Sequence, residues 1–312
     1  MIYTELTEVE DLVTSCGLDL NAVAEIVAHA LEEDLGGHGV VPFGSAGVDV
    51  TSVATIPAEA MASARCVARA AGTLAGLPVA AYTLVRLCAA DWPFELELRC
   101  SDGMQVSPGD VLLDVTGNAR ALLQAERVAL NLLTLMSGVA TATSAWVAAL
   151  SGTHTQVRDS RKTVPGLRVL QKYAVRVAGG VNHRMSLADA ALIKDNHVMA
   201  AGGAVEAFLA VRSAYPDIGV QVEVTSHDQA RAVVSAGARD VLLDNMSIDE
   251  MTAVVAELGD SARFEASGGL TLAHAASVAT TGVNYVAVGA ITHSAPILDI
   301  ALDFLPETRA VG

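Results

Sequence analysis

The second half of the chain carries six short apolar runs, each about the length of one β-strand. They lie at residues 155–158, 189–193, 219–224, 240–243, 263–266 and 284–288. Helical patterns separate them, so the step from one run to the next takes roughly twenty to thirty residues. Repeated strand–helix units of this kind build a parallel sheet or a barrel. Because the region is short for eight full units, we predict an open, incomplete TIM-like α/β barrel.

The first half mixes helical and extended patterns without a regular repeat, which indicates a separate α+β domain over residues 1–118. The expected elements are helices at 19–35 and 77–90 and extended segments at 50–56, 62–70, 94–100 and 111–115. Asp19 or Asn21 is expected to cap the first helix. A long helix over 119–150 leads into the barrel domain, 119–312, whose last ~20 residues we expect to pack back on the first domain.

Charge and cysteine usage limit the classes of protein to consider. The formal net charge is −16, and the four cysteines show no spacing typical of metal ligands or disulfides. We therefore expect reduced thiols and a cytoplasmic protein. Residues 128–153 are uncharged and long enough to cross a bilayer. Polar residues such as Asn131, Thr134 and Ser137 interrupt this stretch, so we expect a buried central helix and no membrane span.

Basic residues concentrate in one part of the chain, residues 158–194, which we call the basic segment. It contains eight of the nineteen Lys and Arg residues, including all three lysines, against only Asp159 and Asp189. Its charge is therefore about +6 within an acidic protein. Apolar residues and glycines separate the cations, which disfavours a simple solvated face. A compact cationic site indicates a small, multiply anionic ligand and argues against nucleic acid, which needs a basic stripe across a surface.

Reactive side chains and glycines follow the six apolar runs, near the point where each predicted strand ends. They are Arg161 and Lys162, Lys194, Glu223, Asp244, Ser267-Gly268-Gly269 and Gly289-Ala290. A barrel gathers the carboxyl ends of its strands around one mouth, where barrel enzymes keep their active sites. We therefore predict that these residues form one active site.

Two kinds of ligand suit this set of residues. The glycine loops at 267–269 and 289–290 are phosphate candidates, because backbone N–H groups approach an anion closely where no side chain intervenes. Glu223 and Asp244 would bind Mg²⁺ together with substrate phosphates, stabilise a developing cation, or pair with the lysines. His183, beside Arg184, is a candidate hydrogen-bond partner for a carboxylate. The sequence contains no P-loop, HExxH motif or dinucleotide fingerprint.

Several longer motifs lie between residues 126 and 294. They are Glu126-Arg127-Val128-Ala129-Leu130-Asn131, Arg161-Lys162-Thr163 with Pro165-Gly166-Leu167-Arg168, Lys172-Tyr173-Ala174-Val175, Gly179-Gly180-Val181-Asn182-His183-Arg184, Ile193-Lys194-Asp195-Asn196-His197, Leu243-Asp244-Asn245-Met246, Glu265-Ala266-Ser267-Gly268-Gly269 and Val288-Gly289-Ala290-Ile291-Thr292-His293-Ser294. Together they resemble the quinolinate phosphoribosyltransferases, or nicotinate-nucleotide pyrophosphorylases (carboxylating), a type II phosphoribosyltransferase family. The resemblance runs from about residue 20 to about residue 305.

This resemblance implies a fold, a reaction and a cofactor. The fold would be an N-terminal α/β sandwich domain joined to an open, seven-stranded α/β barrel, and the protein would work as a homodimer. The reaction would convert quinolinate and phosphoribosyl pyrophosphate to nicotinate mononucleotide, pyrophosphate and CO₂, with Mg²⁺, on the route to NAD. Two departures from the family pattern stand out: the loop at 36–47 is longer than usual, and Ser160 replaces the usual Thr.

The resemblance also implies roles for individual residues. The quinolinate site would contain Ser160, Arg161, His183, Arg184 and Lys194, with Arg127 contributed by the neighbouring subunit. The phosphoribosyl pyrophosphate would be bound by Lys162, Glu223, Asp244, Ser267, Gly268, Gly269, Val288, Gly289 and Ala290. Lys162, Lys194, Glu223 and Asp244 would be the catalytic residues. Of these, Glu223 and Asp244 would also hold the Mg²⁺, directly or through water.

Three other functions stay open on the sequence alone. The first is a paralogue of the same fold that acts on another pyridine or azaheterocyclic acid, which genomic neighbours or substrate kinetics would separate from NAD synthesis. The second is a lyase that forms a Schiff base through Lys194, which borohydride trapping would reveal. The third is a non-catalytic anion-binding module, which the presence of both Glu223 and Asp244 disfavours.

Overall fold

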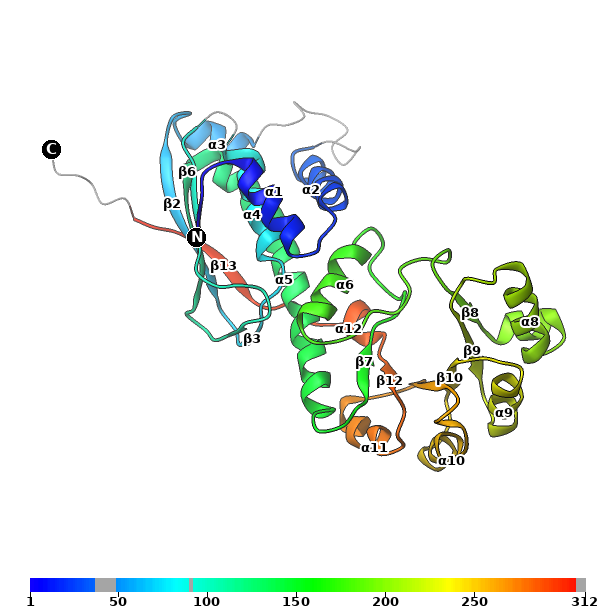
Figure 1. Cartoon of the computed structure of the whole chain (residues 1–312). Coiled ribbons are helices and arrows are strands. Elements are labelled where there is room, and N and C mark those ends of the chain that lie inside the picture. Colours follow the sequence, from blue (N-terminus) through cyan, green and yellow to red (C-terminus); the bar gives the residue numbers. More distant parts are fainter. Residues whose placement is uncertain (37–48, 90–91, 307–312) are drawn as a thin grey trace. The chain divides into compact units, whose positions relative to one another are not determined.

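The computed structural model of the chain describes residues 1–36, 49–89 and 92–306 (Figure 1). The long loop noted at 36–47 therefore lies outside the described residues, apart from Gly36. Two compact units make up the protein. The first contains Met1–Thr141, Pro165–Ala178 and Ala295–Gly312, and the second contains Ala142–Val164 and Gly179–Ser294. This division falls within the long helix and differs from the expected boundary at residue 118, because the first part of that helix packs in the core of the first unit.

The first unit is built on a five-stranded antiparallel sheet. Its order is β1 (Ile2–Tyr3), β4 (Glu95–Leu98), β6 (Val111–Asn118), β2 (Met61–Ala68) and β13 (Ile300–Phe304). β13 pairs with β2, with Leu302 opposite Cys66, so the C-terminal strand forms one edge of this sheet. Two short strands, β3 (Gly72–Thr73) and β5 (Gln105–Val106), pair separately.

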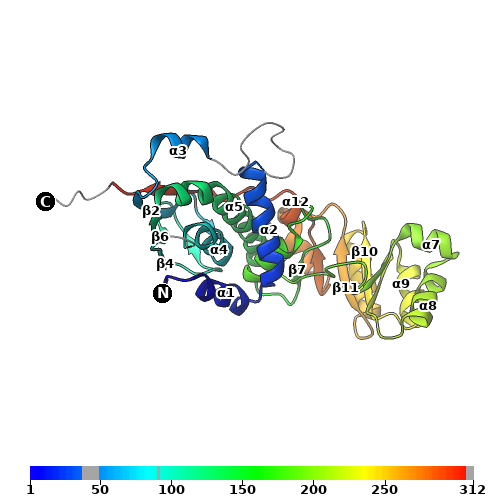
Figure 2. The same ribbon diagram turned by 90° about the horizontal axis from the view of Figure 1, so that it is seen from above.

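Helices make up the rest of this unit. They include α1 (Leu6–Ser15), α2 (Leu20–Asp34), α4 (Leu77–Cys88), α6 (Arg168–Val177) and the first part of α5 (Ala119–Ala149). Figure 2 shows α4 and α5 beside the strands β2, β4 and β6. Asp19 caps α2 as expected, because its carboxylate accepts a hydrogen bond from Ala22 N at 3.0 Å. Asp102 caps α4 through Gly76 N and Leu77 N, and burial raises the pKa of its carboxyl group.

The extended segment expected at 50–56 is wrong: these residues form a helix, α3 (Val50–Thr55). The β-branched residues Val50, Thr51 and Val53 favour a strand by propensity. Asp49 overrides them, because its carboxylate accepts hydrogen bonds from Thr51 N and Ser52 N at the start of the helix. The helix α1 was not predicted either, although Glu5 and Glu8 form a capping box there.

The long helix α5 is buried in the protein as expected. By length and composition it is long and apolar enough to cross a membrane, but half of its most apolar window is buried, as in the core helix of a globular protein. At Gly138 a Cβ atom would overlap Pro296 O, so only glycine allows this close approach of two backbones.

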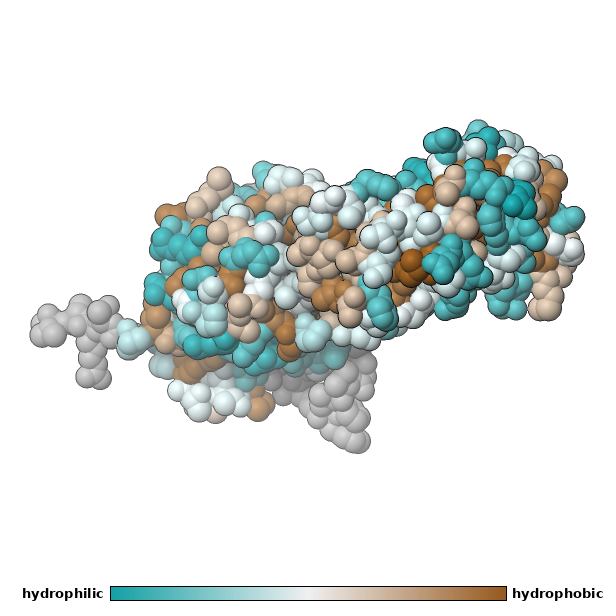
Figure 3. Space-filling view, turned by 90° about the horizontal axis from the view of Figure 1, so that it is seen from below, coloured by the Kyte–Doolittle hydropathy of each residue, from teal (hydrophilic) through white to brown (hydrophobic). Residues whose placement is uncertain are grey.

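On the face seen in Figure 3, hydrophobic residues lie in patches separated by hydrophilic ones.

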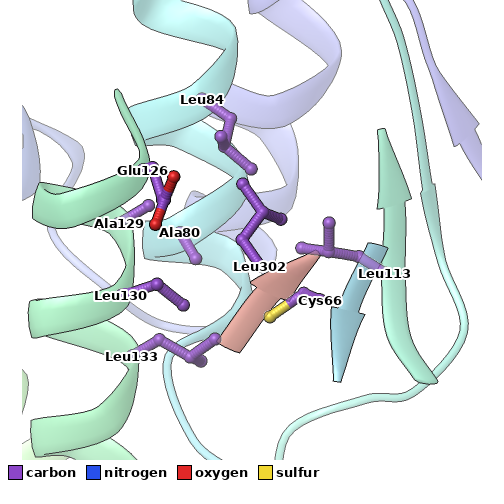
Figure 4. A pocket seen from close by; sticks show the side chains of 9 residues that line it. All are labelled: Cys66, Ala80, Leu84, Leu113, Glu126, Ala129, Leu130, Leu133 and Leu302. Carbon is purple, nitrogen blue, oxygen red and sulfur yellow. The ribbon is translucent and has the colours of Figure 1, made fainter. Parts of the chain in front are cut away.

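A small apolar gap marks the core of the first unit (Figure 4). Leu84 from α4, Leu130 and Leu133 from α5, and Leu302 from β13 point toward it. Cys66 also lines the gap, and burial raises the pKa of its thiol to about 12. The four cysteines are all free, and Cys66 and Cys88 are buried, as the sequence predicts for reduced thiols. This gap is part of the core packing and is too apolar for an anionic substrate.

The second unit contains six parallel strands, each at the place of one predicted apolar run. In sheet order they are β7 (Gln156–Arg158), β12 (Tyr285–Ala287), β11 (Arg263–Ser267), β10 (Asp240–Asp244), β9 (Val220–Val224) and β8 (Ala191–Ile193). Val181 makes a single parallel bridge to Arg158 beyond β7, where the seventh strand implied by the resemblance would lie. The sheet is consistent with an incomplete barrel, which confirms the predicted fold class.

Helices connect these strands and flank the sheet. They are α7 (Asp195–Ala201), α8 (Ala204–Ala214), α9 (His227–Ser235), α10 (Ile248–Leu258), the short 3₁₀ helix η1 (Leu272–His274), α11 (Ala275–Ala279) and α12 (Ala290–His293). Ser226 and Ser247 cap α9 and α10 with their hydroxyl oxygens. The carboxyl ends of the strands therefore carry the loops in which the predicted site residues lie.

Candidate active site

Lys194 and Glu223 come together at the carboxyl ends of neighbouring strands. Lys194 follows β8 directly and precedes α7, and Glu223 lies near the end of β9. The ammonium Nζ is 3.4 Å from Glu223 Oε2, and the two side chains are 49% and 13% exposed. The ammonium therefore stays accessible to an anionic ligand while the carboxylate is mostly enclosed. This pairing agrees with one of the roles considered for Glu223.

Asp244 and Ser267 end two neighbouring strands and lie opposite each other in the parallel register. Asn245 follows Asp244 with φ +53°, the only non-glycine residue with positive φ in the described part of the chain. Its amide N donates to Ser267 O at 2.9 Å, and its side-chain N donates to Asp244 Oδ2 at 2.8 Å. A Cβ at Gly268 would overlap Asn245 Oδ1, so glycine is required in this turn.

Lys162 lies against the loop that follows β12. A Cβ at Gly289 would lie 3.1 Å from Lys162 Cδ, and Thr292 Oγ1 donates to Lys162 O at 2.8 Å. Ser160 Oγ accepts from Lys162 N at 3.1 Å, which shapes the loop after β7. The structure thus brings Lys162 beside Gly289, two residues that the resemblance assigns to phosphoribosyl pyrophosphate. Val288 is buried, and its N donates to Arg158 O, so it holds this loop to β7.

Arg161 and Arg184 form a pair of like charges. Arg161 Nε is buried and has no hydrogen-bond partner among the described residues. Burial lowers the pKa of the Arg184 guanidinium, and the charge of Arg161 lowers it further. A buried donor without a partner and two neighbouring cations are both costly, and an anionic ligand relieves both costs. The pair is therefore suited to a ligand with two carboxylates.

His183 is held by hydrogen bonds on both sides of its ring. Its Nε2 lies 2.7 Å from Gln221 Oε1, and its Nδ1 accepts from Arg184 N at 2.7 Å. Its own backbone N donates to Asp159 Oδ1 at 2.8 Å. The sequence suggested that His183 hydrogen-bonds a ligand carboxylate. In the structure its ring nitrogens face Gln221 and the backbone of Arg184.

A cavity of about 190 Å³ lies beside His183 and Arg184. Its wall includes Ala191, Val220 and Asp240, which are the first residues of β8, β9 and β10. The cavity therefore reaches the amino ends of the strands, away from the mouth that the sequence predicts. Lys194, Glu223 and Asp244 do not line it.

The carboxylates fit a Mg²⁺ ion that is shared with substrate. Leu242 lies opposite both Glu223 and Glu265 in the sheet register, and Asp244 follows two residues later on the same face as Leu242. Among the described residues, no group of three or more His, Cys, Asp or Glu side chains could hold a metal ion alone. Mg²⁺ commonly binds to one or two carboxylates, several waters and substrate phosphates. Two carboxylates at the mouth meet that requirement.

Three cations from the motifs that carry the resemblance belong to the first unit: Arg127, Arg168 and Lys172. Arg127 lies on α5, its side chain is 62% exposed, and Glu126 Oε1 is 3.9 Å away. Lys172, one of the three lysines of the basic segment, lies on α6 and is 1% exposed. Asn245, Gln221 and Glu265 were not among the predicted site residues. The residues around Asn245 do not indicate its positive φ. Asn245 and Glu265 nevertheless lie within motifs that carry the resemblance.

Comparison with known proteins identifies relatives over almost the whole chain. Residues 49–137 match the family profile "Quinolinate phosphoribosyl transferase, N-terminal domain", and residues 139–303 match "Quinolinate phosphoribosyl transferase, C-terminal domain". The nicotinate-nucleotide pyrophosphorylase (carboxylating) of Mycobacterium leprae is 45% identical over 296 residues, which cover 94% of this chain and 100% of that protein. A probable enzyme of the same name from Bacillus subtilis is 39% identical, covering 84% of this chain and 90% of that protein.

Solved structures agree with these sequence matches. NadC from Streptococcus pyogenes has a TM-score of 0.84 and 34% identity, and the match covers 93% of this chain and 99% of that one. The nicotinate-nucleotide pyrophosphorylase from Francisella tularensis has a TM-score of 0.82 and 32% identity, covering 91% and 96%.

Proposed function

Because the chain belongs to the quinolinate phosphoribosyltransferase family, we propose a role in that family's reaction for each residue of the candidate site. The protein is a nicotinate-nucleotide pyrophosphorylase (carboxylating), a pentosyltransferase of NAD biosynthesis. It transfers the phosphoribosyl group of phosphoribosyl pyrophosphate to quinolinate and releases pyrophosphate and CO₂, giving nicotinate mononucleotide. Membership of this family favours phosphoribosyl transfer over the two other hypotheses, a Schiff-base lyase and a non-catalytic anion-binding module.

The observation that supports the assignment most directly is the pair Arg161 and Arg184. Quinolinate carries two adjacent carboxylates on one ring, and the pair offers two guanidinium groups with an unpaired buried donor. Lys194 adds a third cation with about half of its side chain exposed. Ser160 shapes the loop that carries Arg161. We assign these residues to the quinolinate site, with His183 as the neighbour that accepts from the backbone N of Arg184.

The loops at the other strand ends suit phosphoribosyl pyrophosphate. The loops 267–269 and 288–290 follow the neighbouring strands β11 and β12, and Lys162 lies against the second loop. Glycines in both loops let a phosphate approach the backbone N–H groups closely. Glu223 and Asp244 lie at the same mouth. We assign this set to the sugar and its phosphates.

The chemistry follows from these charges. Departure of pyrophosphate leaves positive charge on the ribose, which the carboxylates of Glu223 and Asp244 stabilise. The ring nitrogen of quinolinate then attacks C1 of the ribose, and Lys194 and Arg161 hold the ring in place for the attack. The neighbouring carboxylate leaves as CO₂, because the positively charged ring stabilises the electron pair that stays on the ring carbon, and this carbon then takes up a proton from water. Mg²⁺, held by Glu223 and Asp244 directly or through water, would neutralise charge on the pyrophosphate as it leaves.

We expect chelation with EDTA to abolish turnover. The leaving pyrophosphate and the two carboxylates are all negatively charged, so the metal ion is needed to neutralise the pyrophosphate. The measurement is pyrophosphate release with and without excess Mg²⁺ added back. Full recovery on addition of Mg²⁺ is the expected result. Undiminished release in EDTA would remove the metal from the scheme.

We also propose a homodimer in which Arg127 completes the quinolinate site of the partner subunit. Arg127 is 62% exposed, and its contact with Glu126 at 3.9 Å is too long and exposed to hold it strongly. In an isologous two-fold interface, each subunit would contribute its Arg127 to the site of the other.

The free, partly buried thiols fit a cytoplasmic location, which we propose as well.

Subunit mixing tests the role of Arg127. Arg127→Ala and Glu223→Ala are each expected to be inactive. In a hybrid dimer, one site keeps its own Glu223 and receives an intact Arg127, while the other site is doubly defective. With random pairing half of the dimers are hybrids, so about a quarter of wild-type activity should return. If demonstrated subunit exchange restores no activity, Arg127 does not act across an interface.

A further inference from the structure

Three polar side chains are linked across the interior of the second unit. Arg158 Nη1 and Gln221 Nε2 both donate to Glu265 Oε2, at 2.9 and 2.8 Å. They come from β7, β9 and β11, and we call Arg158, Gln221 and Glu265 the interior polar chain. Glu265 is 1% exposed and Gln221 is 6% exposed. The Arg158 guanidinium lies 3.5 Å from the centroid of the Tyr285 ring, so its position is fixed from a second side.

A contribution to stability is a weak explanation for the interior polar chain. A buried ion pair is often no better than well-packed apolar side chains of similar size, because both charges lose their hydration. In addition, Glu265 Oε1 and Arg158 Nε are buried and have no hydrogen-bond partner among the described residues. Each such atom carries a further cost. A role other than stability is therefore needed to explain these residues.

The interior polar chain sets the protonation of His183. A carboxylate only accepts hydrogen bonds, so the amide nitrogen of Gln221 must face Glu265 and its amide oxygen must face His183. That amide oxygen, 2.7 Å from His183 Nε2, also only accepts. His183 Nε2 must therefore carry the proton.

The other side of the ring leads to the same tautomer. Arg184 N donates to His183 Nδ1 at 2.7 Å, so Nδ1 carries no proton. The hydrogen bonds thus place the proton on Nε2, and both ring nitrogens are used within the chain. Asp159, which is fully buried, accepts from His183 N at 2.8 Å and from Asn182 Nδ2 at 2.5 Å. This segment is therefore held through both its backbone and the His183 ring.

We propose that the interior polar chain positions His183 and, through the His183 ring, the backbone of Arg184. Its members are positioning residues, which touch no substrate themselves. His183 is then a link that orients Arg184 toward a quinolinate carboxylate, instead of a ligand that binds the carboxylate with a free nitrogen. This inference rests on the proposed assignment of Arg184 to the quinolinate site.

Steady-state kinetics of Gln221→Leu test the link to substrate. Leu has a similar size but breaks the hydrogen bonds to both His183 and Glu265. A misplaced binding group costs up to about a hundredfold, so we expect the KM for quinolinate to rise about ten- to hundredfold. The KM for phosphoribosyl pyrophosphate should change less than about twofold, because the Gln221 side chain bonds to His183 and Glu265, whereas the nearby proposed ligand Glu223 pairs with Lys194. An unchanged KM for quinolinate would overturn the inference.

Val222→Ala is the matched control. Val222 is the next residue on β9, is fully buried, and points to the opposite face of the sheet. The substitution lowers thermal stability and leaves the interior polar chain intact. Both KM values should match those of the wild type at a temperature where the variant is folded. If Val222→Ala raises the KM for quinolinate as much as Gln221→Leu, the effect comes from general loosening and the inference is overturned.

Exchanging the two polar groups distinguishes hydrogen-bond order from simple packing. Gln221→Glu places two carboxylates together and should raise the KM for quinolinate. When Gln221→Glu is combined with Glu265→Gln, the amide introduced on β11 donates to the carboxylate introduced on β9. An oxygen of that carboxylate again accepts from His183 Nε2. We expect the double variant to bind quinolinate better than Gln221→Glu alone. A double variant that is as poor as the single one would contradict the proposal.

Nitrogen NMR of the histidine side chains tests the tautomer without substrate. The His183→Asn variant identifies the signal of this residue among the eight histidines. In the wild type, the signal should show a proton on Nε2 and none on Nδ1. In the Gln221→Leu variant, the His183 ring should no longer be held in this one tautomer. A proton on Nδ1 in the wild type would overturn the inference. Wild-type turnover of quinolinate in the same preparation shows that the proposed function stands in that case, whereas absence of turnover would overturn the function itself.

Discussion

Glu223→Gln should lower kcat by about 10²- to 10³-fold, the usual effect of removing one preorganised electrostatic contact from a transition state. Gln keeps the size and shape of the side chain but removes the negative charge that faces the developing cation on the ribose. The Lys194 ion pair at 3.4 Å is lost as well, but with Lys194 half exposed this pair contributes little to stability. Steady-state assays of pyrophosphate release measure the change in kcat.

Glu257→Gln is the control for this substitution. Glu257 lies on α10 in the same unit, and its carboxylate pairs with Arg231 at 2.7 Å, a shorter ion pair than that of Glu223. It is remote from the strand ends that carry the proposed site. Its kcat should match that of the wild type. If Glu223→Gln retains kcat to within a few-fold of the control, Glu223 does not stabilise the transition state.

Arg161→Ala is expected to lower kcat/KM by about ten- to 150-fold. A hydrogen bond to a charged group contributes about 1.5–3 kcal/mol, and each ~1.4 kcal/mol corresponds to a factor of ten. Arg161→Lys keeps the charge but loses the planar pair of donors, so its activity should lie between those of wild type and Arg161→Ala. The measurement is kcat/KM for quinolinate at saturating phosphoribosyl pyrophosphate.

Arg212→Ala serves as the control for Arg161. Arg212 lies on α8 in the same unit and donates to Pro216 O at 2.8 Å from an exposed position. Its kinetics should be those of the wild type. A structural role for Arg161 would instead give an Arg161→Ala variant that melts early and has normal kinetics at low temperature. That result would remove Arg161 from the quinolinate site.

The barrel was predictable from the sequence because each of its strands is a local pattern. The runs at 219–224 and 240–243 correspond to β9 and β10 to within one residue. Predicting the strands also predicted where their carboxyl ends lie. Glu223 and Asp244 were therefore expected at the same end of the barrel. At 50–56 the local pattern misled, because a single capping carboxylate at Asp49 outweighed the strand propensity of the residues after it.

Contacts between distant strands were beyond local patterns. Arg158 and Glu265 are 107 residues apart, and nothing near either residue indicates their ion pair. The sequence indicated His183 as a hydrogen-bond partner for a carboxylate and gave no sign of its contact with Gln221 from β9. The sequence grouped Arg161 with Arg184, and the folded chain shows that the charge of Arg161 acts on Arg184. The unpaired Arg161 Nε is visible only in the folded chain.

Product analysis tests the central assignment most directly. The wild-type protein is incubated with quinolinate, phosphoribosyl pyrophosphate and Mg²⁺, and CO₂ and pyrophosphate are measured together. Both should be released in equal amounts, and nicotinic acid, which lacks the second carboxylate, should be a far poorer substrate. A protein that uses nicotinic acid as well as quinolinate, or releases pyrophosphate without CO₂, would contradict the account of a site built for a dicarboxylate.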